Sequence, residues 1–91
     1  MDTKTASNEL HKFQRDLRAY IRNNIHVRAS KRTISMEDLK SGFESKMGYA
    51  IGKYNMWFVK MIRATFKVVV SCSNMNVYAK TGESLFITGS R

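Results

Sequence analysis

The 91-residue sequence contains no proline, only five glycines and a single cysteine. No stretch is therefore rich enough in proline or glycine to form a linker between domains, and 91 residues suffice for one domain with one hydrophobic core. Cys72 has no second cysteine for an internal disulfide or a thiolate metal site, which fits a reducing compartment. We expect one domain over residues 8–91, preceded by a flexible N-terminus at residues 1–7.

Acidic residues are also scarce, because seven Asp and Glu stand against sixteen Lys and Arg and leave a formal net charge of +9. Apolar runs fall well short of the roughly 18 residues that span a bilayer, and the first residues lack the apolar core of a signal peptide. We therefore expect an intracellular protein, in the cytoplasm or nucleus, and not a membrane protein. A charge of this size favours an anionic partner, and nucleic acid and an anionic membrane surface are the two common ones, which the sequence separates only in part.

Residues that could perform catalysis or bind a metal do not form a recognisable pattern. His11 and His26 stand far apart, with no acidic or thiol ligand at metal-binding spacing. A glycine-rich phosphate loop is absent, and Glu37 and Asp38 are better explained by favourable charge at the start of a helix. We therefore predict no enzymatic activity, no cofactor and no metal.

The first helix is predicted over residues 8–26, where apolar residues recur at spacings of three and four and Ser7 or Asn8 can serve as N-cap. Its opposite side carries a basic stripe made of Lys12, Arg15, Arg18 and Arg22. Such a stripe is often only a solvated helix face. Because Glu9 and Asp16 lie toward the opposite edge, a surface that faces phosphates is an equally good interpretation.

The second helix is predicted over residues 36–47. Ser35 and Asp38 have the spacing of a capping box, and Gly48 is well placed to end the helix. Before it, residues 27–32 are interpreted as a basic connector, and the β-branched pair Thr33 and Ile34 suits a very short strand.

The third, central helix is predicted over residues 53–65, within the densest apolar run of the chain. At about 100° per residue, one side of this helix carries Tyr54, Trp57, Phe58, Met61 and Ile62. The other side carries Met56, Lys60 and Arg63. Because a large aromatic side chain can bury roughly 150–250 Å², we expect this apolar stripe, with Trp57 on it, to contribute most to the core.

After Phe66 the sequence becomes typical of strands. β-Branched and aromatic residues gather at 67–70, 77–78 and 85–88, and Cys72 is expected in a strand or in the core. Turn-like residues at 73–76 and 80–83 separate these segments, and either turn could be the tip of a β-hairpin.

The predicted fold class is α+β, with three helices followed by a C-terminal β-hairpin. This order of elements, over about residues 8–89, resembles the winged helix-turn-helix family, in particular the regulatory factor X type and the C-terminal domains of viral primase-helicases. Those domains also end a hairpin in an aromatic-x-x-Gly sequence, as Phe86 to Gly89 do here. Residues 28–39 have a second resemblance, to the end of a histone fold, although a β-rich tail is foreign to that fold.

The winged-helix resemblance implies duplex DNA binding, with the central helix in the major groove. Predicted contacts on its solvent face are Lys53, Asn55, Met56, Lys60 and Arg63, since Asn and Arg can bond bidentately to adenine and guanine edges. The DNA backbone is predicted to contact Lys31, Arg32, Lys67 and Lys80, and the basic stripe adds Arg15, Arg18 and Arg22.

Two alternatives use the same surface. Met56 and Val59, on or beside the exposed side of the central helix, favour an interaction protein that binds an acidic protein partner, and the first helix could pair with its copy in a homodimer. RNA is another possible ligand, although the aromatic residues that would stack on bases are expected in the core. The small size and methionine content suggest a viral or mobile-element origin.

Overall fold

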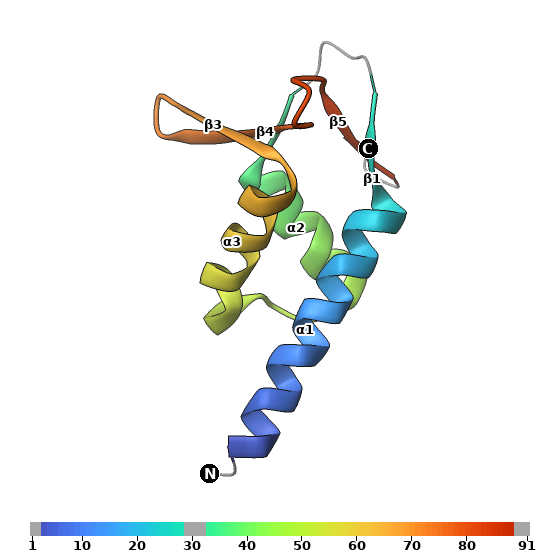
Figure 1. The fold of residues 1–91 in the computed structure, drawn as a ribbon, viewed down its shortest axis with the longest axis vertical. Helices are drawn as coiled ribbons and strands as arrows, with labels where there is room; N and C mark the ends of the chain where they lie inside the picture. Colours follow the sequence, from blue (N-terminus) through green and yellow to red (C-terminus); the bar gives the residue numbers. More distant parts are fainter. Residues whose placement is uncertain (1–2, 29–32, 89–91) are drawn as a thin grey trace.

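The computed structural model describes residues 3–28 and 33–88 and shows an α+β protein with three helices and antiparallel strands (Figure 1). The helices are α1 (Thr3–Asn24), α2 (Met36–Met47) and α3 (Asn55–Thr65), with a 3-10 turn, η1, at Gly52–Tyr54 before α3. The strands are β1 (Ile25–Val27), β2 (Ile34–Ser35), β3 (Lys67–Ser71), β4 (Asn74–Tyr78) and β5 (Leu85–Ile87). The predicted fold class is confirmed, and the arrangement is compatible with a winged-helix-like one. The paired strands contradict the histone-fold alternative.

Helix α2 matches the predicted bounds because its two ends are specified locally. The Ser35 backbone N–H donates to Asp38 Oδ2 at 2.9 Å, and the Asp38 N–H donates to Ser35 Oγ at 3.2 Å. Gly48 ends the helix with a φ of 80°, a left-handed conformation that glycine adopts at little cost. The capping box and the C-terminal glycine are therefore both confirmed.

The bounds of the other two helices differ from those predicted. Helix α1 already begins at Thr3, so Ser7 and Asn8 lie inside it and the prediction that one of them caps it is wrong. It ends at Asn24, two residues before the predicted end. Helix α3 begins at Asn55, because residues 52–54 form the tighter turn η1.

The strands form two small sheets. The three-stranded sheet has the order β2-β4-β3, so the predicted short strand before α2 joins the hairpin through the pair Ile34 and Val77. The second sheet pairs β1 with β5, with Ile25 opposite Ile87. Strand β1 replaces the predicted end of the first helix and the start of the connector. The Thr88 N–H donates to the Asn24 carbonyl at 2.7 Å and so satisfies a group left free at the end of α1.

The hairpin tip lies at Cys72 and Ser73, between the last paired residues Ser71 and Asn74. The turn at 80–83 instead leads from β4 toward β5, where the Ala79 N–H bonds to the Glu83 carbonyl at 2.8 Å. Cys72 is exposed and has a positive φ, so the expectation that it lies in a strand or in the core is wrong.

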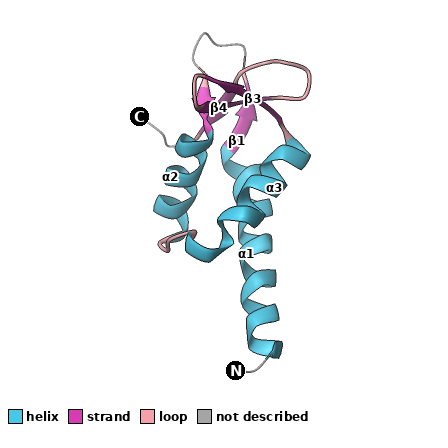
Figure 2. Cartoon of the chain, turned by 90° about the vertical axis from the view of Figure 1, so that its left-hand side faces the viewer, coloured by secondary structure: helices cyan, strands magenta, loops and turns pink. Residues whose placement is uncertain are grey.

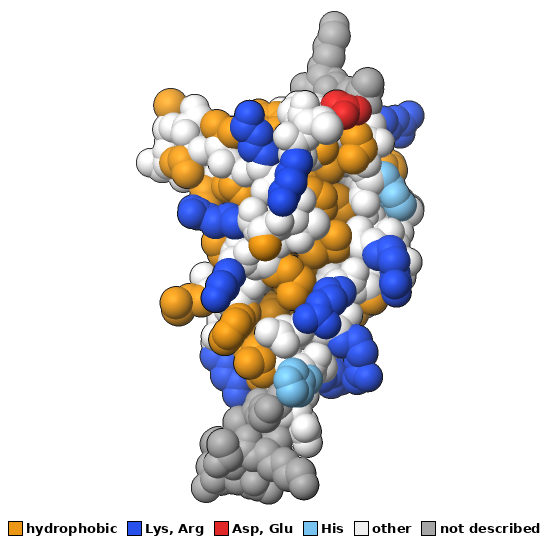
Figure 3. All heavy atoms as spheres, in the orientation of Figure 1, with side chains coloured by type: hydrophobic (Ala, Val, Ile, Leu, Met, Phe, Trp, Pro, Cys, Tyr) orange, Lys and Arg blue, Asp and Glu red, His pale blue; other side chains and the backbone are white. Residues whose placement is uncertain are grey.

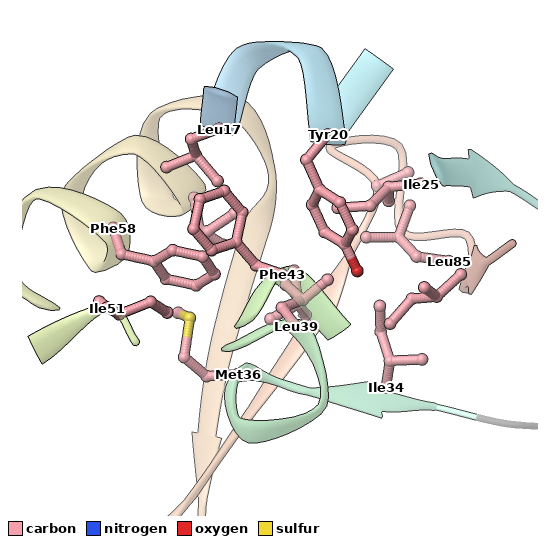
Figure 4. Close-up of a cluster of buried hydrophobic side chains, with 14 of the residues drawn as sticks. Leu17, Tyr20, Ile25, Ile34, Met36, Leu39, Phe43, Ile51, Phe58 and Leu85 are labelled. Atoms are coloured by element: carbon pink, nitrogen blue, oxygen red, sulfur yellow. The ribbon is translucent and has the colours of Figure 1, made fainter. Parts of the chain in front are cut away.

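The core gathers around Phe43 of α2 and not around Trp57 (Figure 4). Its ring meets Phe13, Tyr20, Tyr49 and Phe58 edge-on, with ring centroids 5.5 to 5.8 Å apart. Helix α3 buries only Phe58 and Ile62, and its Trp57 side chain is 41% exposed. The prediction of a buried tryptophan is therefore wrong, because the elements that pack on α3 cover a narrower stripe than the one on which Trp57 was placed.

Candidate nucleic-acid interface

The outer face of α3 presents Met56, Lys60 and Arg63 to solvent, as predicted. All three are exposed, and Met56 is 81% exposed. They lie on the side opposite Phe58 and Ile62, because successive residues of a helix are rotated by about 100°. Helix α3 contains no acidic residue, so this face is purely cationic and apolar.

Asn55 and Lys53 precede this face and do not lie on it. Asn55 stands seven residues before the buried Ile62 and therefore projects from the same side of α3 as that residue. Asn55 is exposed in the first turn of α3. Lys53 lies in η1, outside the helix in which it was predicted, and its Nζ contacts Glu9 Oε2 at 3.3 Å. The hydrogen bond to Glu9 raises the pKa of Lys53. Lys53 is therefore held toward α1 and is a weaker candidate for a base contact.

The acidic side chains of α1 are both engaged away from its arginines. Glu9 accepts hydrogen bonds from Lys53 and Tyr54. Asp16 accepts the Tyr49 hydroxyl at 2.8 Å and lies 3.6 Å from Lys12 Nζ. Burial, together with this hydrogen bond and the charge of Asp16, raises the pKa of Tyr49, so the phenol remains a donor at neutral pH.

Consequently Arg15, Arg18 and Arg22 are exposed on α1 and form no ion pair with any other described residue. Three unpaired guanidinium groups on one helix face are the part of the predicted basic stripe that remains available to phosphates. Lys12, the fourth member, is partly neutralised by Asp16.

A shallow groove of about 330 Å³ runs between α1 and α3, and it brings two of these arginines beside the central helix. Its lining consists of Arg18, Ile21, Arg22, Met61 and Thr65. Figure 3 shows the whole molecule in the orientation of Figure 1. Basic side chains gather over α1 and α3 on either side of a band of hydrophobic side chains, and acidic side chains are scarce on this face. Basic side chains of the first and the central helix are thus visible on one face of the molecule, and Arg18 and Arg22 lie closest to the central helix.

Trp57 lies at the edge of this face, although the helical periodicity predicts it on the buried side. The Lys60 ammonium stands 5.4 Å from the centre of the indole, a cation–π contact. Trp57 precedes Met61 by four residues, so both side chains lie on the same side of α3, about one turn apart. No local signal in the sequence identifies Trp57 as exposed, because its exposure depends on how much of α3 the neighbouring elements cover.

The other predicted contacts are dispersed. Lys67 is exposed at the start of β3, and Lys80 is exposed in the turn between β4 and β5, away from the hairpin tip. The hairpin instead exposes Val69 and Val70. Lys31 and Arg32 lie outside the described residues.

Comparison with known proteins adds no relative: no protein-family model, curated protein or solved structure matches the chain. Within residues 3–28 and 33–88, no three His, Cys, Asp or Glu side chains are grouped so that they could hold a metal ion. No helix of that part of the chain has the length and apolar character needed to cross a membrane. The interface described above is therefore argued from its own geometry and charge.

Proposed function

We propose that this chain is a small nucleic-acid-binding protein of the winged-helix type that contacts duplex DNA through α3. The observation that carries the proposal is that one view of the molecule shows basic side chains over both α1 and α3 (Figure 3). Arg18 and Arg22 of α1 line the groove beside Met61 of α3, and Lys60 and Arg63 are exposed on α3 itself. Such a face neutralises phosphates and releases the counterions condensed on DNA. Arg63 has the planar group that can bond bidentately to a guanine edge in the major groove.

The proposal is tested by replacing Lys60 and Arg63 together with alanine. Both side chains are exposed and make no ion pair with another described residue, so folding should be nearly unaffected. The variant should bind duplex DNA more weakly than the parent. For the parent, the logarithm of the binding constant should fall steeply with the logarithm of the salt concentration. Arg63→Ala alone should cost roughly 1–3 kcal/mol on a preferred sequence and less on a random one.

A matched control removes two cations from a different surface. Lys40 and Lys46 lie on α2, which occupies one side of the molecule while α1 and α3 occupy the other (Figure 2). Their double alanine variant loses the same charge and should keep most of the affinity. Because Lys40 is half-buried and ion-paired with Glu37, thermal unfolding of this variant is measured as well. Equal binding by the Lys60/Arg63 variant and the parent, with both folded, would show that α3 is not the reading helix.

A protein-binding function is the second candidate, and one observation favours it. The strand order β2-β4-β3 leaves β3 at the edge of its sheet, and Val70 on that strand is 63% exposed. An exposed apolar edge strand is a template for a further strand from another chain. The positive net charge favours an acidic segment as that strand.

The two candidates predict opposite behaviour in nuclease-treated lysate. A stoichiometric partner bound to β3 should survive nuclease and the Lys60/Arg63 replacement, but it should be lost in a Val70→Lys variant, because a charge on an edge strand opposes pairing. Light scattering at two concentrations separates such a partner from self-association.

A further inference from the structure

Trp57 is the only tryptophan of the chain, and the fold leaves its large ring only partly covered. A tryptophan of a domain this small would contribute strongly to stability if it were buried. Instead the core is completed by Phe43 and its four ring neighbours, and the indole lies at the rim of the cationic face. The exposed part of the indole is therefore free to contact a ligand.

We propose that the indole of Trp57 is a stacking platform for an unpaired base of a nucleic-acid strand whose backbone follows the groove between α1 and α3. This inference rests on the proposed function and adds the single-stranded element that the same face would bind. The protein would then favour a single strand, or a junction between single and double strands, over a blunt duplex.

The geometry of a duplex explains why the base must be unpaired. In double-stranded DNA the faces of the bases are covered by their neighbours, and only base edges reach the grooves. The face of an indole cannot be used against such edges, whereas an unstacked base of any identity offers a π surface to it. A platform of this kind therefore adds affinity without sequence preference.

The groove between α1 and α3, which begins one helical turn from Trp57 at Met61, suits a nucleic-acid strand rather than a protein segment. Arg18 and Arg22 line the groove with the apolar side chains of Ile21 and Met61, a combination that can hold phosphates and the apolar faces of sugars and bases. No acidic residue lies on α3, and the chain carries a net charge of +9.

Lys60 occupies the indole in the free protein and would move when a base binds there. Its ammonium now stands over the indole, 5.4 Å from the ring centre. Because lysine carries its charge on a flexible stem, a base that stacks on the ring can displace the ammonium, which then reaches a neighbouring phosphate. Ring and cation would thus both be used by one nucleotide.

The fluorescence of the single tryptophan tests this inference directly. A ten-nucleotide oligothymidine should change the emission of Trp57 on binding, while a blunt duplex of mixed sequence, followed by the anisotropy of a label on the DNA, should bind with little change in that emission. A duplex with a single-stranded overhang should behave like the single strand.

Substitutions extend the test to affinity. Trp57→Ala should weaken oligothymidine binding by roughly five- to 150-fold, the range that corresponds to one base–aromatic stack. Trp57→Phe keeps a smaller ring and should lose less. Val27→Ala, which shortens an exposed apolar side chain on β1, is the matched control and should bind like the parent. Thermal unfolding of each variant verifies that it is folded.

The outcomes separate the inference from the proposed function. If Trp57→Ala binds single strands and overhangs like the parent, and the emission does not respond, the platform is overturned, even where the Lys60/Arg63 variant still loses duplex binding. If the emission responds and Trp57→Ala weakens single-strand binding while the Lys60/Arg63 variant binds duplex normally, the platform stands and duplex reading by α3 falls. If no nucleic acid binds the parent near 50 mM salt, both proposals fail, and the face is left to a protein partner.

Discussion

Gly42 lies directly beneath the hydroxyl group of Tyr20, so that a Cβ atom at this position would collide with that oxygen. Tyr20 is buried, and its ring packs edge-on against Phe43 with centroids 5.6 Å apart. The tyrosine must therefore shift from this packing before an alanine can fit at position 42. Glycine is required here by the close approach of α1 and α2, and not by a special backbone conformation.

We expect Gly42→Ala to lower the free energy of unfolding by about 1–3 kcal/mol, the usual cost of forcing extra atoms into a packed interior. The change would otherwise favour the helix, because alanine has a better helix propensity than glycine by about 1 kcal/mol. Urea unfolding monitored by circular dichroism measures the difference.

The collision can be separated from other effects of the substitution. In a Tyr20→Phe background the hydroxyl is gone, so Gly42→Ala should cost much less there than in the parent. Ser45→Ala, at an exposed position of the same helix, should change stability by no more than about 0.5 kcal/mol. An equal cost of Gly42→Ala in both backgrounds would contradict the proposed contact.

At the scale of elements, the hairpin between β3 and β4 has a turn whose residues do not suit its backbone. Cys72 and Ser73 have φ values of 47° and 69°, as the two central residues of a type I′ turn require. Residues other than Gly, Asn and Asp adopt this left-handed conformation at a cost of about 1–2 kcal/mol each. The pair Asn-Gly is the preferred solution.

Replacing Cys72-Ser73 with Asn-Gly should therefore stabilise the protein by about 1 kcal/mol, which corresponds to roughly 4–8 °C in the unfolding temperature of a domain of this size. The matched control is a substitution in the other turn that should change stability in the opposite direction. Gly82, with a φ of 94° in the turn between β4 and β5, should destabilise the protein when replaced with alanine. A hairpin variant that melts below the parent would show that the tip does not have this geometry.

The elements that sequence could predict are those with local signals. Helix α2 was predicted to the residue because Ser35, Asp38 and Gly48 specify its ends without help from the rest of the chain. The sequence does not decide which of two turns forms the hairpin tip, because Cys-Ser has no turn signature. Strand β1 was missed because Ile25 continues the helical periodicity of α1, and its partner β5 lies about 60 residues later.

The candidate site, like the fold, was predictable only where a local signal specifies it. Exposure of Met56, Lys60 and Arg63 follows from helical geometry alone, and it is confirmed. The exposure of Trp57 depends on how much of α3 its neighbours cover, and the groove depends on the distance between α1 and α3. Neither is encoded in a short stretch of sequence, since both are set by tertiary packing.

At the scale of the whole molecule, charge should act on stability and on binding in opposite directions. The formal net charge of +9 produces self-repulsion in the compact state. The described residues form only three ion pairs, each including an exposed side chain, and surface pairs of this kind contribute little. Repulsion, rather than salt-bridge attraction, is therefore the electrostatic effect that added salt should mainly screen.

Raising sodium chloride from about 20 to 200 mM should thus increase the unfolding temperature by a few degrees, because screening by salt shortens the Debye length to below about 10 Å. Over the same range duplex affinity should decrease by orders of magnitude, since binding several phosphates releases counterions. Thermal melts and anisotropy titrations on one preparation measure both. The Lys60/Arg63 double alanine variant should show a smaller rise in melting temperature and a shallower loss of affinity, because the same two cations contribute to both effects. A melting temperature that falls with salt would instead show that the ion pairs, such as Lys53 with Glu9, outweigh the repulsion.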